Sequence, residues 1–136
     1  MKKILFVTLT AIALVLSTSG IANAAWKEIG SNEQMTVYVD TDTVQSKGEK
    51  AQIFSMLDFK KPGANPQNKK VVNSIVGLNE FDCPNVSYRP IAFREFTEQK
   101  GAGEIVSDNN TPDSKFEPVQ SNTWAAGVFN TVCKIK

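Results

Sequence analysis

The sequence predicts an α+β protein in which an antiparallel sheet of five or six strands carries one C-terminal helix on one face, pinned by a disulfide. Three observations predict this architecture. Apolar residues alternate with a period of two through most of the chain after residue 25, as in half-buried strands. Near the C-terminus they recur every four residues, as in an amphipathic helix. The chain has two cysteines, and the second lies in this helical segment.

The first 24 residues have the three parts of a secretory signal. A positive head of Met1, Lys2 and Lys3 precedes an apolar run at 4–17, and small residues follow at Ala22 and Ala24. The apolar run is shorter than the roughly 20 residues that a membrane-spanning helix needs. We therefore expect the signal peptide 1–24 to be cleaved, leaving a single domain at 25–136.

The exported part shows no lipid attachment signal and almost no net charge. A bacterial lipoprotein has a cysteine directly after its cleavage site, whereas the first cysteine here is Cys83. We therefore expect no membrane anchor after cleavage, and a periplasmic or secreted location with any association to the cell surface made through a partner. Without Lys2 and Lys3, 13 basic residues face 14 acidic ones, which gives no general attraction to nucleic acid or anionic lipid.

The absence of histidine narrows the possible chemistry. The 136 residues include no histidine, which is the commonest general base and the commonest transition-metal ligand. A Ser-His catalytic triad is thereby excluded for the serines of this chain. We expect a non-enzymatic protein with no cofactor and no metal.

Six segments have the alternation of strands. Their expected bounds are 26–29, 35–39, 51–59, 71–82, 87–97 and, for a short last strand, 104–107. Turns are expected at 31–34, 47–48 and 101–103, and loops at 60–70 and 108–114. Gly77 predicts a bulge or a close approach of two backbones, and Pro90 predicts an edge or a bulge because it lacks an N–H.

The same alternation predicts which side chains share a face. In the strand expected at 87–97, the two faces are predicted to carry Ile91 and Phe93 on one side and Tyr88, Ala92 and Phe96 on the other. The helix is expected at 123–133, with Ser121 or Asn122 as its N-cap. Its two apolar stripes are Trp124, Val128 and Val132, and beside them Ala125, Phe129 and Cys133.

Cys83 and Cys133 are expected to form one disulfide, because an oxidising compartment favours the pairing of the only two cysteines. The bond would tie the middle of the chain to its end and contribute ~4 kcal/mol by the chain-entropy model. The alternative is a metal or redox pair, which the lack of a CxxC spacing disfavours.

The order of several short motifs resembles the surface-adhesin protein E family of Gram-negative bacteria. The motifs are Trp26, Tyr38-Val39-Asp40, Gly48, Leu57-Asp58-Phe59, Ser74, Glu80-Phe81-Asp82-Cys83, Arg89, Gly101-Ala102-Gly103 and Cys133. The resemblance implies a six-stranded antiparallel sheet with a C-terminal helix held by the disulfide. It also implies a binding module for host matrix or serum proteins such as vitronectin, laminin and plasminogen. A periplasmic structural or envelope-maintenance protein with no host ligand is the alternative.

Four lysines are the predicted binding residues. Lys60 and Lys61 precede the Pro/Gly/Asn-rich segment, and Lys69 and Lys70 follow it. If the flanking strands form a hairpin, the four meet at one end and offer a basic patch for a sulfated glycan or an acidic protein segment. The alternative is that these lysines keep the protein soluble and prevent pairing of strand edges.

Other polar and aromatic groups have simpler explanations. Asp40 and Asp42 could ligate a hard cation but are better explained by a turn. Acidic and basic residues on the strands are expected to form cross-strand ion pairs: Asp58, Glu80, Asp82, Arg89, Arg94 and Glu95. Three aromatic residues are expected to form the core between sheet and helix or to line a pocket: Trp26, Trp124 and Phe129.

Overall fold

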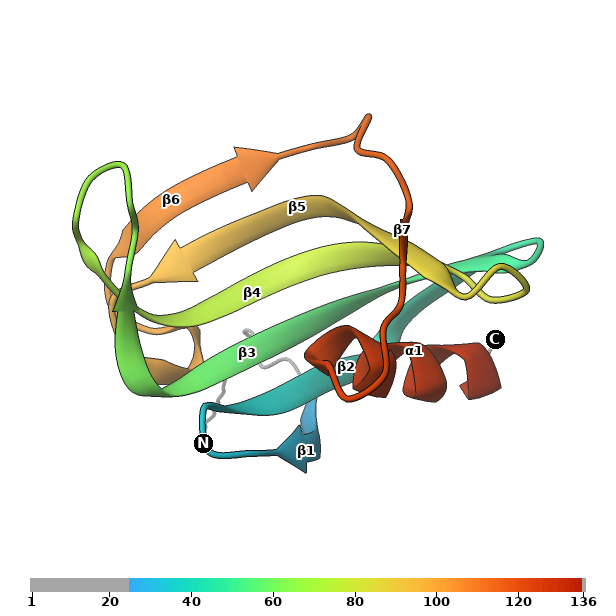
Figure 1. The fold of residues 1–136 in the computed structure, drawn as a ribbon, viewed down its shortest axis with the longest axis horizontal. Coiled ribbons are helices and arrows are strands. Elements are labelled where there is room, and N and C mark those ends of the chain that lie inside the picture. The colour runs from blue at the N-terminus through green and yellow to red at the C-terminus, as the bar shows by residue number, and fades with distance from the viewer. Residues whose placement is uncertain (1–24, 136) are drawn as a thin grey trace, which may run out of the picture.

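The computed structural model describes residues 25–135, and the predicted signal peptide lies outside them (Figure 1). The strands are β1 (Trp26–Ser31), β2 (Met35–Lys47), β3 (Lys50–Ala64), β4 (Val71–Asp82), β5 (Ser87–Phe96), β6 (Ile105–Asn110) and β7 (Glu117–Pro118). A short 3-10 helix, η1 (Gln99–Gly101), follows β5, and the helix α1 (Trp124–Ile135) ends the described chain. The predicted antiparallel sheet with one C-terminal helix is confirmed. No helix in residues 25–135 is long and apolar enough to cross a membrane.

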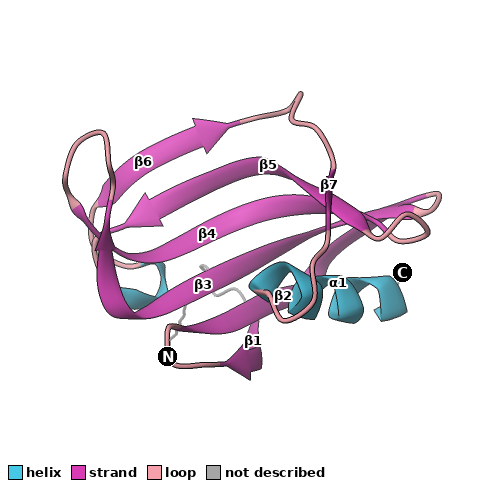
Figure 2. Ribbon diagram, in the orientation of Figure 1, coloured by secondary structure: helices cyan, strands magenta, loops and turns pink. Residues whose placement is uncertain are grey.

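The sheet is an antiparallel meander in which each strand pairs with the next along the chain. The spatial order is β1-β2-β3-β4-β5-β6, and the two-residue β7 pairs with the first two residues of β5. Such an order needs only short connections, and Gly48, at φ 60°, makes the tightest of them between β2 and β3. Figure 2 shows α1 lying across one side of this sheet, which we call the helix face.

The core lies between α1 and the helix face. Its buried members are Val37, Val39, Ala51, Ile53 and Phe81 from the sheet and Val128 and Val132 from the helix. The helix begins one residue later than predicted, and its N-cap is a different residue from the two that were expected. Thr123 Oγ1 accepts a hydrogen bond from the N–H of Ala126 at 3.2 Å, so Thr123 takes the cap position predicted for Ser121 or Asn122.

The disulfide joins Cys83, just after β4, to Cys133 in the last turn of α1. The Cα atoms are 5.8 Å apart, within the range that disulfides require. The bond therefore fixes the C-terminal half of the helix to the end of the sheet where β4 turns into β5. The predicted pairing of the two cysteines is confirmed.

β3 extends further than predicted. The segment 60–70 was expected to be a loop, but β3 continues through Lys60 and Lys61 to Ala64, and only 65–70 lies between strands. Pairing resumes at Gly63 opposite Val72, so 59–62 stand opposite Asn73 alone in a wide bulge. Backbone hydrogen bonds override the loop composition, as when the Lys60 N–H donates to the carbonyl of Gln34, just before β2, at 2.8 Å.

A bulge in β5 changes the predicted faces of that strand. Leu78 of β4 pairs with Ala92, and the next residue, Asn79, pairs with Pro90, so Ile91 is the extra residue. The alternation shifts by one at this point, so Tyr88 comes to the same face as Phe93. The predicted placement of these two residues on opposite faces is therefore wrong.

Candidate functional site

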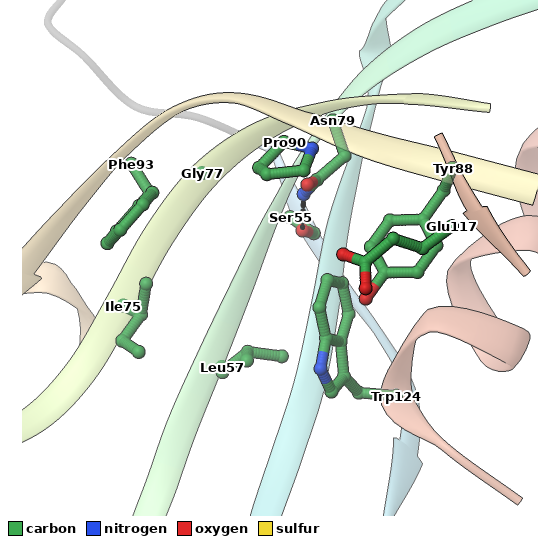
Figure 3. Close-up of a pocket in the computed structure, with 10 residues that line it drawn as sticks. All are labelled: Ser55, Leu57, Ile75, Gly77, Asn79, Tyr88, Pro90, Phe93, Glu117 and Trp124. Atoms are coloured by element: carbon green, nitrogen blue, oxygen red, sulfur yellow. Dashed lines mark hydrogen bonds between the residues drawn. The ribbon is translucent and has the colours of Figure 1, made fainter. Parts of the chain in front are cut away.

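A groove lies on the helix face beyond the N-terminus of α1. Here β3, β4 and β5 continue past the helix, and their side chains enclose a cavity of about 260 Å³ (Figure 3). The lining residues are Ser55, Leu57, Ile75, Gly77, Asn79, Tyr88, Pro90, Phe93, Glu117 and Trp124. Because these come from three strands, the β7 segment and the helix, only the folded chain forms the groove.

Apolar side chains and a glycine form most of the floor. Leu57, Ile75 and Phe93 point into the groove from neighbouring strands. Gly77 lies among them, and a Cβ at this position would be 3.2 Å from Cβ of Phe93 and 3.3 Å from the carbonyl oxygen of Ala92. The predicted close approach at Gly77 is confirmed, and the missing side chain leaves the floor deeper.

Two buried polar side chains interrupt this apolar floor. Ser55 is 3% exposed and Asn79 is 6% exposed. Asn79 Nδ2 donates to Ser55 Oγ over 3.5 Å, which is a long hydrogen bond, and Asn79 makes no other side-chain hydrogen bond to residues 25–135. The carbonyl oxygen of Asn79 therefore has no hydrogen-bond donor among residues 25–135 and is free at the groove. This is unusual, because buried amides normally have their hydrogen-bonding groups paired.

Two aromatic rings and a carboxylate form the rim at the helix end. The rings of Tyr88 and Trp124 meet edge to face, with centroids 5.6 Å apart and planes at 80°. Figure 3 shows the Glu117 carboxylate pointing towards the space beside these rings. Burial, and then the negative charge of Glu117, raises the pKa of Tyr88 above its ordinary value, so the phenol is neutral at physiological pH.

Arg89 holds the segment that carries Glu117. We call residues 111–118 the strap, since they connect β6 to β7 across the end of β5. The Nε of Arg89 lies 2.9 Å from Glu80 Oε1, and its Nη1 donates to the carbonyl of Pro112 at 2.6 Å. The guanidinium also lies over the ring of Phe116, 5.4 Å from its centroid. Arg89 therefore connects a buried carboxylate of the sheet to the strap.

We expect Arg89→Ala to lower the free energy of unfolding by about 2–3 kcal/mol. The buried Glu80 carboxylate loses its cation and keeps only the Gln52 amide at 3.3 Å, and the strap is freed. Arg94→Ala is the matched control, since Arg94 pairs with Asp108 on the same sheet with side chains 55% and 51% exposed. Such an exposed pair contributes less than about 1 kcal/mol. Urea denaturation of the two variants measures both values, and equal losses would contradict the role given to Arg89.

Comparisons with known proteins now identify the family. The family model described as surface-adhesin protein E matches residues 26–134. The chain belongs to the surface-adhesin protein E family. This membership confirms the resemblance found in the motifs and indicates an exported, adhesin-like binding protein. No curated protein sequence matches the chain.

Solved structures of protein E from Haemophilus influenzae share the fold of this family member. One covers 88% of this chain and 92% of its own chain, with a TM-score of 0.59 and 12% identity. A second crystal form covers 88% and 95%, with a TM-score of 0.62 and 12% identity. The protein from non-typeable Haemophilus influenzae covers 88% and 82%, with a TM-score of 0.57 and 12% identity. At this identity the likeness establishes the common fold.

The four predicted lysines of this adhesin E-like chain lie at the end of the sheet opposite the disulfide. Lys60 and Lys61 belong to the bulge of β3, beside the β1–β2 connection, and Lys69 and Lys70 end the 65–70 loop. All four are exposed. The two pairs are separated by the last residues of β3, roughly 10 Å of strand.

The strand carboxylates mainly support the structure. Glu80 pairs with Arg89, as predicted for a cross-strand ion pair. Arg94 pairs with Asp108, which was expected in a loop but lies in β6. Asp58 instead accepts the N–H of Lys100 at 2.8 Å. The remaining two accept side-chain amides: Asp82 from Asn85, and Glu95 from Asn65.

Asp40 and the aromatic residues have separate roles. Asp40 Oδ1 accepts the N–H of Asp42 at 3.1 Å, so the side chain bonds its own backbone as predicted. The prediction of a strand-ending turn here is wrong, because β2 continues through a bulge after Asp40 to Lys47. No group of three or more potential metal-ligating side chains occurs in residues 25–135. Phe129 joins the core against Phe81, with ring centroids 6.2 Å apart. Trp124 lines the groove, whereas Trp26 lies on the edge strand β1, away from both.

Four polar groove residues were not predicted as site residues from the sequence: Ser55, Asn79, Tyr88 and Glu117. Three of them look like ordinary strand residues, and Glu117 lies in a polar connection. The only signal in the sequence was Pro90, for which a bulge was one of the predicted readings, and the bulge that follows it brings Tyr88 to the helix face.

Proposed function

We propose that this protein is an exported, non-enzymatic adhesin-like module that binds host matrix or serum proteins or sulfated glycans. The observation that supports this most strongly is the family match over residues 26–134. The family resemblance implies vitronectin, laminin and plasminogen as the partners to test. The protein acts outside the cytoplasm, in keeping with the predicted signal peptide.

We further propose that the exposed Lys60, Lys61, Lys69 and Lys70 provide the electrostatic part of the contact. None of the four forms an ion pair with a residue in the described part of the chain, so their charges are available to an acidic partner. Unpaired exposed charges mainly accelerate association and make affinity dependent on salt.

We expect the quadruple variant Lys60→Ala, Lys61→Ala, Lys69→Ala and Lys70→Ala to bind its partner at least about tenfold more weakly at low salt. The measurement is surface plasmon resonance against heparin, vitronectin, laminin and plasminogen at several salt concentrations. The variant is also expected to show a shallower dependence of log Kd on log salt concentration.

A matched control removes four other exposed lysines: Lys27, Lys47, Lys115 and Lys134. It carries the same change in net charge and is expected to stay within about twofold of the unmodified protein. Equal loss in both variants would show that only net charge matters and would remove the four-lysine assignment. Failure of the unmodified protein to bind any of the four partners would contradict the proposed host binding.

A further inference from the structure

We propose that the groove beside α1 binds an organic ammonium ion carried on a short apolar body. The cation lies against the Glu117 carboxylate and the rings of Tyr88 and Trp124, and the body lies over the apolar floor. This site is separate from the four lysines, so the failure of either proposal leaves the other intact.

The rim of the groove is arranged to hold a cation. Glu117 makes no ion pair with any residue of 25–135, and its carboxylate points towards the groove (Figure 3). The edge-to-face rings of Tyr88 and Trp124 form two walls of a corner beside it. A ring face attracts a cation, and Trp does so most strongly. A carboxylate and two aromatic rings around one space therefore suit an ammonium group.

The buried polar groups of the floor favour a ligand that donates hydrogen bonds. Asn79 donates its amide to Ser55, which leaves the Asn79 carbonyl oxygen as a free acceptor although the residue is only 6% exposed. A buried acceptor without a partner is costly, so a ligand that donates hydrogen bonds would be favoured there. An ammonium ion is a donor and has no acceptor capacity, which matches this floor.

The composition and size of the groove select against other ligands. No lysine or arginine is among its ten lining residues, so an anion would meet the Glu117 charge without a compensating cation. The apolar side chains of Leu57, Ile75 and Phe93 favour a hydrocarbon body over a fully polar ligand. A cavity of about 260 Å³ accommodates one side chain or a small amine. The ligand is therefore either a free alkylamine or the lysine side chain of a polypeptide.

The test uses the exported chain, 25–136, with n-hexylamine as the probe and n-hexanol and hexanoate as its neutral and anionic analogues. Indole N–H resonances follow binding, with Trp124 as the reporter and Trp26, outside the groove, as the internal reference. Hexylamine is expected to shift the Trp124 signal saturably, with an affinity at least about tenfold above that of hexanol. Equal affinities for hexylamine and hexanol would overturn the proposal.

Glu117→Gln keeps the shape of the side chain and removes its charge. Because Glu117 is exposed and its side chain makes no hydrogen bond or ion pair with residues 25–135, the variant is expected to fold and to lose the preference for hexylamine. Glu104→Gln, an exposed carboxylate before β6, is the matched control and is expected to keep that preference. Equal behaviour of the two variants, at an unchanged Tm, would contradict the role of Glu117.

A lysine peptide distinguishes the two sources of the ammonium group, a free amine and a polypeptide lysine. Acetyl-Ala-Ala-Lys-Ala-Ala-amide is titrated beside its form with an acetylated lysine. Tighter binding of the unmodified peptide than of hexylamine assigns the groove to a polypeptide lysine, and binding of hexylamine alone assigns it to a free amine. Binding of neither probe would refute the site.

Discussion

Removal of the Cys83–Cys133 disulfide is expected to lower the free energy of unfolding by about 4 kcal/mol. The two cysteines are 50 residues apart in sequence, so the bond removes much of the freedom of the unfolded chain. The loss is a large fraction of the roughly 5–15 kcal/mol that stabilises a typical domain. The last turn of α1 should also detach more readily from the sheet.

The measurement is urea denaturation of the double variant Cys83→Ala and Cys133→Ala beside the unmodified protein, oxidised and reduced. The reduced protein controls for the loss of the sulfur atoms from the core and is expected to match the double variant within about 1 kcal/mol. A loss below about 1 kcal/mol in both would show that core packing alone holds the helix.

Phe81→Ala is expected to cost about 3–5 kcal/mol. Phe81 is fully buried between β4 and α1, and its ring stacks on Tyr88 at 5.7 Å as well as packing against Phe129. Its truncation opens a cavity under the helix and removes the support of one wall of the groove. A small loss of stability with an intact groove would contradict the role of Phe81 in the packing between β4 and α1.

Phe54→Ala is the matched control for this experiment. Phe54 is on β3, and its side chain is on the opposite face of the sheet and is 38% exposed. Its truncation leaves no closed cavity and removes a side chain that is only partly buried, so a smaller loss of about 1–2 kcal/mol is expected. Thermal denaturation measures the loss of stability in each variant. Near-ultraviolet circular dichroism reports on the groove, since only Phe81→Ala should disturb the aromatic signals of Tyr88 and Trp124.

Local patterns predicted the strands and the helix well, because one face of each element is buried. The alternation around Ile53 and the four-residue spacing of Val128 and Val132 both reflect burial in the same core. The prediction failed where strand pairing decides the structure. The end of β3 has the composition of a loop, yet its backbone pairs with β4 and with Gln34, just before β2.

The groove could be predicted less well from the sequence than the fold. Tyr88 was predicted on the face opposite Phe93, and only the bulge at Ile91 brings both to the helix face. Glu117 reaches the rim because Arg89 holds the strap, through contacts between residues more than 20 positions apart. By contrast, the exposure of the lysines at 60–70 follows from their type and position.

The sequence alone determined the family, the α+β architecture and the pairing of Cys83 with Cys133. These properties follow from local periodicity, from the order of motifs and from the presence of only two cysteines, none of which requires knowledge of strand register. The tertiary structure alone decided which polar side chains meet in the groove. A single extra residue in a strand reverses the side-chain alternation beyond it, so the site depends on a register that no local pattern encodes.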